Sequence, residues 1–144
     1  MNSKFEKYFE TYEVASSYVC NINSPSAIYG MFDERLKDLI VWVREGIGMP
    51  MCANNWIIYE KLKQTNPRLT KFEQRGIRVK DDPDCKRQKF VTKSAHFEGK
   101  ALDFDVHGMT AQQVRAWLEE NADEAPRPFR VEDGVNWVHI DVMP

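Results

Sequence analysis

Apolar residues recur at helical spacing in two segments of the N-terminal half. Residues 4–19 mix aromatic and aliphatic side chains with charged ones, and this pattern predicts one short amphipathic helix. Residues 31–48 predict a second helix, because an apolar stripe runs through them and Gly46 and Gly48 follow as stop signals. The stripe consists of Phe32, Leu36, Leu39, Ile40 and Val43.

The middle of the chain is polar and irregular. Pro50 blocks further helix, so residues 49–56 are predicted to form a short strand that leads into a polar loop. Residues 60–93 then show neither helical nor strand periodicity. A structureless run of this length is unusual in a small domain, and such loops often line a binding site or form a lid.

Regular patterns return in the last third of the chain. Residues 100–106 alternate as a strand, and one face of that strand carries Ala101, Asp103 and Asp105. Residues 110–121 predict a helix, because Thr110 can cap it and Gln113 stands at the capping-box spacing.

A hairpin is predicted at the C-terminus. Residues 129–132 and 135–142 resemble two strands around the turn Asp133-Gly134. Because the chain has 144 residues and shows no repeat or linker, we predict one α+β domain over residues 1–144, with residues 1–29 as an N-terminal helical extension.

Composition excludes several classes of protein. A hydrophobic content of 42% is enough for a core, and a net charge of −2 gives no general electrostatic case for nucleic acid. Three widely spaced cysteines with no CxxC pair predict neither a disulfide framework nor a cysteine-rich zinc site. The charged N-terminus is no signal peptide, and no run nears the roughly 20 apolar residues of a membrane span. We therefore predict synthesis in the cytoplasm and no membrane insertion.

Two dense stretches concentrate the histidines. SAHFEGKALDFD (residues 94–105) holds His96 and Asp103, and a turn at Gly99 lets the two side chains converge. NWVHIDV holds His139, a candidate third ligand, with Trp137 and Asp141 on the same strand face to orient it. Two aspartates on one strand face call for a cation or an arginine, so a metal site and a salt-bridged network both fit the spacing. His107, before a glycine, is interpreted as a turn or surface residue.

The order Ser94-x-His96-x-x-Gly99-x-Ala101-x-Asp103 resembles the SxHxxGxAxD signature of the zinc-dependent D-alanyl-D-alanine peptidases, the M15 peptidase family. WVHID resembles the late ligand-bearing strand of that family, and the resemblance covers roughly residues 30–144. It implies the Hedgehog/DD-peptidase fold, a small antiparallel sheet with flanking helices. It also implies one zinc ion per chain, held by His96, Asp103 and His139 with water in the open position.

The same resemblance implies peptidoglycan stem peptides as substrate. In such relatives an upstream arginine or a nearby polar residue holds the peptide, and the candidates here are Gln74, Arg75 and Arg78, with Ser94 either stabilising the turn or binding substrate. DD-carboxypeptidase, DD-endopeptidase and LD-endopeptidase activities all fit such a site.

One position departs from the family pattern. Many members carry a glutamate three residues before the last histidine as general base, and this chain has Asn136 there. Glu132 is the first candidate for the general base in its place, followed by Asp141 or Asp105. The explanation favoured here is that the chain belongs to a branch that never used that glutamate, with Glu132 an ordinary solvated hairpin residue. A third explanation is that the chain binds wall peptides without cutting them well.

The leading hypothesis is a zinc metallopeptidase acting on peptidoglycan, such as a phage or prophage endolysin that a holin releases or a virion carries. A housekeeping bacterial amidase is a variant of it. The alternatives are a zinc-stabilised module that binds cell-wall peptides without turnover and a structural virion component. A monomer is the default expectation.

Overall fold

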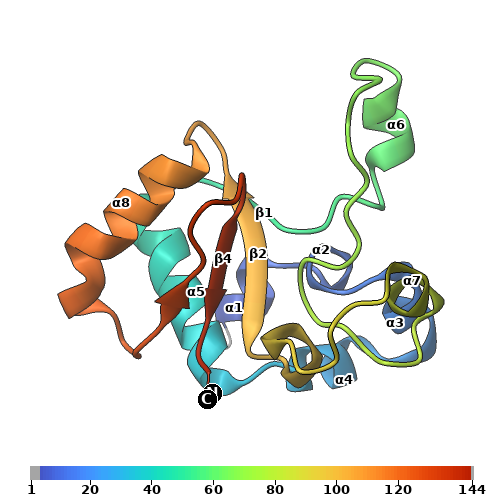
Figure 1. The fold of residues 1–144 in the computed structure, drawn as a ribbon, viewed down its shortest axis with the longest axis horizontal. Helices are drawn as coiled ribbons and strands as arrows, with labels where there is room; N and C mark the ends of the chain where they lie inside the picture. The colour runs from blue at the N-terminus through green and yellow to red at the C-terminus, as the bar shows by residue number, and fades with distance from the viewer. Residues whose placement is uncertain (1–3, 144) are drawn as a thin grey trace.

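A four-stranded antiparallel sheet stands at the centre of the computed structural model, which describes residues 4–143 (Figure 1). Its spatial order is β1-β2-β4-β3. The strands are β1 (Met51–Cys52), β2 (Ala101–Val106), β3 (Arg130–Val131) and β4 (Val138–Asp141). The chain is therefore an α+β domain with a small antiparallel sheet and several helices, as predicted at this coarse level.

The two faces of the sheet have different chemistry. Leu102 and Phe104 of β2 pair with Ile140 and Val138 of β4, and all four side chains are fully buried in the core. Apolar side chains of the two longest helices, α5 (Glu34–Ile47) and α8 (Ala111–Asn121), belong to the same core. Because side chains alternate along a strand, Asp103 and His139 lie together on the opposite face.

The two long helices confirm the local signals in the sequence except the stop signal at Gly46, which lies inside α5. Helix α5 begins after Asp33, whose side chain accepts from the Arg35 backbone N–H, and it ends at Gly48, which has φ +76°. Helix α8 begins after Thr110, and Thr110 and Gln113 form the reciprocal capping box. A 3-10 turn, η2 (Ala122–Glu124), follows α8.

The prediction of one helix over residues 4–19 is wrong. The structure has α1 (Lys4–Tyr8), α2 (Thr11–Val14) and α3 (Ser17–Ile22), followed by α4 (Pro25–Gly30). The break between α2 and α3 has a tertiary cause, because the carbonyls of Val14 and Ala15 accept hydrogen bonds from Ile77 N–H (2.9 Å) and Trp56 Nε1–H (2.9 Å). Those two carbonyls therefore do not accept the backbone hydrogen bonds that a continuous helix would need.

The irregular stretch 60–93 contains two short helices that periodicity did not predict. They are α6 (Tyr59–Lys63) and α7 (Pro83–Gln88). Helix α6 lies on an arm that projects from the body, whereas α7 lies close to α3 (Figure 1). Another 3-10 turn, η1 (Ala95–Glu98), leads into β2.

The C-terminal hairpin is confirmed, but its connection is longer than the predicted two-residue turn. Strand β3 pairs with β4 through Arg130 with Asp141 and Val131 with Ile140. Residues 132–137 connect them, and Arg115 of α8 donates to the carbonyls of Val135 (3.2 Å) and Trp137 (3.1 Å). These bonds hold the connection against α8 instead of in the strand ladder. None of the described helices is long and apolar enough to cross a membrane.

Candidate metal centre

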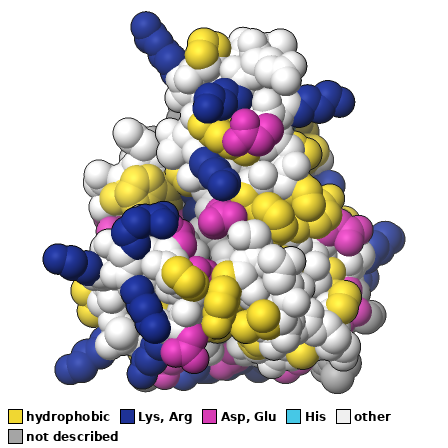
Figure 2. Space-filling view, turned by 90° about the vertical axis from the view of Figure 1, so that its right-hand side faces the viewer, with side chains coloured by type: hydrophobic (Ala, Val, Ile, Leu, Met, Phe, Trp, Pro, Cys, Tyr) yellow, Lys and Arg dark blue, Asp and Glu magenta, His cyan; other side chains and the backbone are white. Residues whose placement is uncertain are grey.

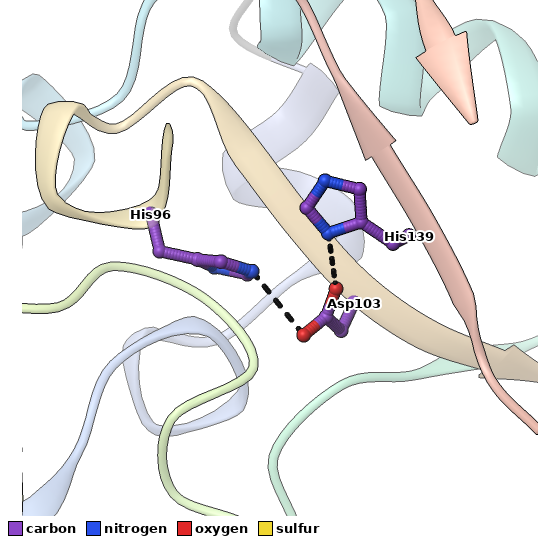
Figure 3. Close-up of side chains that lie close together, drawn as sticks. All are labelled: His96, Asp103 and His139. Carbon is purple, nitrogen blue, oxygen red and sulfur yellow. Dashed lines mark hydrogen bonds and ion pairs between the residues drawn. The ribbon is translucent and has the colours of Figure 1, made fainter. Parts of the chain in front are cut away.

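Three side chains predicted as metal ligands converge in the structure. His96 comes from η1, Asp103 from β2 and His139 from β4 (Figure 3). One ligand atom from each lies within 4.8 Å of the others, so the group could hold a metal ion. The antiparallel register causes part of this convergence, because Asp103 and His139 are direct partners across β2 and β4.

The turn that carries His96 depends on two residues of the first motif. The Ser94 hydroxyl caps η1 by accepting from the His96 backbone N–H at 3.3 Å, so the structure shows the turn-stabilising role considered for Ser94. Gly99 ends the turn with φ +68°, and a Cβ there would lie 1.9 Å from the Met31 carbonyl oxygen. Glycine is therefore required for both conformation and space.

The inner atoms of the cluster lie at hydrogen-bond distances. His139 Nδ1 is 2.7 Å from one oxygen of Asp103, and His96 Nε2 is 3.2 Å from the other. The two imidazole rings meet edge to face with centroids 5.3 Å apart. His96 and Asp103 are buried, and His139 is partly exposed.

The outer ring nitrogens each have an acceptor. His96 Nδ1 lies 2.8 Å from the Gly76 carbonyl, and His139 Nε2 lies 2.9 Å from Asp141 Oδ2. A carbonyl can only accept, so His96 Nδ1 carries a proton, and Nε2 is the ring nitrogen that faces Asp103. Metal-binding histidines are oriented in this way by carbonyl and carboxylate partners. The donor set therefore fits a divalent cation.

Electrostatics within the cluster favour added positive charge. Burial disfavours the Asp103 carboxylate, but hydrogen bonds to His139 and His96 outweigh this and lower the pKa of Asp103. Burial likewise disfavours charge on His139, but its hydrogen bonds to Asp103 and Asp141 raise its pKa. The pKa of Asp141 is lowered: burial opposes this, and bonds to Arg130 and His139 overcome it. A bound divalent cation would offset the negative charge of Asp103 and Asp141, as a proton on His139 does.

The salt-bridged alternative fits both aspartates, because each has an arginine neighbour, and the one at Asp105 is closer. Arg75 Nη1 lies 2.7 Å from Asp105 Oδ2, which makes Asp105 half of an ion pair. The nearest guanidinium to Asp103 belongs to Arg78, at 4.0 Å, and this is longer than either histidine contact of Asp103. The two carboxylates of one strand face thus have separate roles.

A cavity of about 470 Å³ opens beside Asp103. The long polar stretch supplies most of its wall, and Trp137, just before β4, also lines it. Two guanidinium groups stack on aromatic rings there, Arg75 over Phe72 and Arg78 over Phe90, with 3.7 and 4.0 Å to the ring centroids. The stretch therefore lines a cavity at the cluster, as its length led us to expect.

The three substrate-binding candidates all line this cavity but differ in their bonding. The Gln74 amide donates to Asp82 and Asp84 and accepts from the Cys85 thiol, so its side chain braces α7. Arg75 is held by Asp105. Arg78 donates through Nε to the Gln74 carbonyl, and burial lowers its pKa. Of the three, Arg78 is the one whose side chain forms an ion pair with the Asp103 carboxylate, at 4.0 Å.

The candidate bases occupy distinct places. Both Asp141 oxygens are engaged, by His139 Nε2 and by Arg130 Nε at 2.7 Å, so Asp141 orients the ligand. Glu132 is exposed, and its backbone N–H donates to the His139 carbonyl at 3.2 Å, which continues the β3–β4 register and places Glu132 beside His139. Asn136 lines a separate hollow of about 410 Å³ with Asp105. His107 is an exposed turn residue, as predicted.

Two partners of the cluster were missed in the sequence. The Gly76 carbonyl leaves no sequence signal, because a backbone acceptor has no side-chain identity. It reaches His96 because glycine fits against Val14, where a Cβ would lie 2.0 Å from the Val14 carbonyl oxygen. Arg130 was missed because the predicted two-residue turn would place it opposite Trp137, whereas the longer connection places it opposite Asp141.

Searches of family models, curated proteins and solved structures found no match to this chain. The resemblance to the zinc peptidases therefore depends on the motif residues themselves and on the cluster that they form.

Proposed function

We propose that this protein is a zinc-dependent peptidase that hydrolyses peptide bonds in peptidoglycan stem peptides or cross-links. The observation that supports it most is the convergence of His96 Nε2, the Asp103 carboxylate and His139 Nδ1 beside a cavity of about 470 Å³. Both histidines have their outer nitrogens bonded, as metal ligands do.

Zinc suits this donor set. Two imidazole nitrogens and one carboxylate are ligands that zinc accepts, and three protein ligands with an open position distinguish catalytic sites from closed structural ones. Bound zinc would lower the pKa of a water molecule toward 7 and polarise the scissile carbonyl. The placement of the motif before and on β2, with the last ligand on neighbouring β4, supports the Hedgehog/DD-peptidase fold.

Residues around the cluster supply the remaining roles. Arg78 would bind a carboxylate or carbonyl oxygen of the peptide, since its guanidinium faces the cavity next to Asp103. Glu132 would take the proton from water and pass it to the leaving amine, because the strand register places it next to His139. Asp141 would hold His139 in the tautomer that points Nδ1 inward.

The second candidate is a zinc-stabilised module that binds wall peptides without cutting them. It is favoured by Asn136, which cannot serve as a base, and by the exposure of Glu132. A virion component that keeps the fold as a scaffold is a weaker form of the same idea. Under the leading proposal the chain acts as a lysis enzyme of a phage or prophage, as a monomer, once released to the cell wall.

Metal content and wall hydrolysis of purified protein test the proposal. We expect one zinc per chain and clearing of peptidoglycan in a zymogram, both lost in His96→Ala. His107→Ala is the matched control, because it removes an exposed turn histidine and should change neither property. Zinc without hydrolysis would favour the binding module, and absence of zinc from the wild type would refute the metal centre.

Glu132→Gln tests the base separately. We expect a loss of hydrolysis of about 100-fold or more with zinc content unchanged, since general-base catalysis contributes about 10²–10⁴-fold. Glu98→Gln is the control, because Glu98 is an exposed carboxylate of η1. Full activity in Glu132→Gln would assign the base elsewhere.

A further inference from the structure

The charge of this chain is distributed very unevenly. Residues 57–93 contain eleven Lys and Arg against five Asp and Glu, a formal charge of +6, so the rest of the chain carries −8 (−2 − 6). Nine of these basic side chains are exposed, whereas only Glu60 and Asp81 among the acidic ones are. A basic surface thus exists on a protein that is acidic overall.

The same segment exposes aliphatic side chains. Among the described residues, the exposed large hydrophobic ones are Ile22, Ile57, Ile58, Leu62 and Val91, and four of these five belong to residues 57–93. Their exposed fractions run from 40% at Leu62 to 70% at Val91. Ile58 and Leu62 are four residues apart and joined by a backbone hydrogen bond, so they share one side of α6.

These residues belong to two elements of the fold. One is the arm around α6, which projects from the body, and the other is α7 with the residues on either side of it (Figure 1). Figure 2 faces this side of the molecule and shows Lys and Arg side chains projecting around it, with hydrophobic and acidic side chains between them. Lys71 and Arg87, one from each element, also line the cavity beside Asp103. We name the exposed side chains of residues 57–93 the basic-aliphatic surface.

We propose that the basic-aliphatic surface docks on an anionic phospholipid membrane. Lys and Arg near a bilayer are attracted by its negative headgroups, and isoleucine, leucine and valine enter the boundary between headgroups and acyl chains. A polyanionic polymer would satisfy the charges but offer nothing to the aliphatic side chains. Single-stranded nucleic acid would be bound by exposed aromatic rings, and the exposed large hydrophobic residues here are aliphatic. A bilayer surface offers both chemistries together.

Docking of this kind is peripheral. Lys71 and Arg87 of this surface line the cavity, so a membrane on the surface would lie next to the cavity. The inference depends only on exposed charge and apolar side chains, and it does not require the cluster to bind zinc or to hydrolyse peptides.

Sedimentation with vesicles tests the inference on the full chain. We expect binding to vesicles of equal phosphatidylcholine and phosphatidylglycerol, no binding to phosphatidylcholine alone, and weaker binding as salt is raised. Lys61→Gln with Lys63→Gln should weaken binding by about fivefold per charge removed. Lys7→Gln with Arg127→Gln removes two exposed charges outside residues 57–93 and should leave binding unchanged.

The aliphatic residues decide between a membrane and a soluble polyanion. Ile58→Ser with Leu62→Ser should weaken binding to the anionic vesicles by about tenfold or more, since each removes exposed aliphatic surface from the contact. Because both side chains are exposed, the variant should keep the wild-type melting temperature, which circular dichroism checks. Wild-type binding by this variant would show that the surface binds charge alone and would overturn the membrane proposal, as would failure of the wild type to bind anionic vesicles.

Discussion

Asp141→Ala removes a buried carboxylate that contacts the candidate metal cluster from outside. Its Oδ2 lies 2.9 Å from His139 Nε2, and its Oδ1 lies 2.7 Å from Arg130 Nε. Without this acceptor, His139 is free to rotate or to change tautomer, and its Nδ1 becomes a weaker donor to a metal. Outer partners of metal ligands are typically worth about 10–100-fold in metal affinity, or about 1.4–2.7 kcal/mol. The bond to Arg130 adds little, because that side chain is 62% exposed.

Competition with a chromophoric chelator measures the zinc dissociation constant directly. We expect Asp141→Ala to raise it by about 10–100-fold and Asp141→Asn by less, because the amide oxygen still accepts from His139. Asp38→Asn is the matched control, since it breaks the Asp38–Arg127 ion pair on a different part of the surface. An unchanged dissociation constant in a folded Asp141→Ala protein would refute the idea that Asp141 orients His139.

Three further predictions follow from the same geometry. Zinc affinity should fall as pH falls, because His139 has a raised pKa and zinc must displace its proton; chelator competition between about pH 8 and 5 measures this, and a flat profile would contradict it. The free energy of unfolding of the zinc-free protein should fall as pH drops below the ordinary aspartate range, because Asp103 and Asp141 have lowered pKa values and lose their stabilising charge on protonation. Urea unfolding at a series of pH values measures this, and Asp103→Asn should lose less stability at low pH than the wild type. Gly76→Ala should destabilise the fold by about 1–3 kcal/mol, because its Cβ would lie 2.0 Å from the Val14 carbonyl oxygen; Gly30→Ala, with nothing within 4 Å, is the control, and equal urea midpoints would disprove the steric argument.

Local patterns predicted the elements whose causes are local. Helices α5 and α8 depend on an apolar stripe and on caps a few residues away, and strand β2 depends on alternation, so all three were predicted within a few residues of their observed bounds. The N-terminal helix failed for the opposite reason. Val14 and Ala15 give their carbonyls to Ile77 and Trp56, which lie 63 and 41 residues further along the chain.

The candidate metal cluster likewise has some features set by local sequence and others set by tertiary contacts. The amino-acid sequence by itself determined the identity and order of His96, Asp103 and His139, because ligand chemistry belongs to side chains and the spacing around Gly99 is local. Only the tertiary structure decided that Asp103 and His139 are register partners, that the Gly76 carbonyl holds His96, and that Arg130 holds Asp141. The tertiary structure also pairs Arg75 with Asp105 and places the guanidinium of Arg78 next to Asp103. The physical reason is that these contacts join residues distant in sequence, through strand register and backbone carbonyls that no residue pattern encodes.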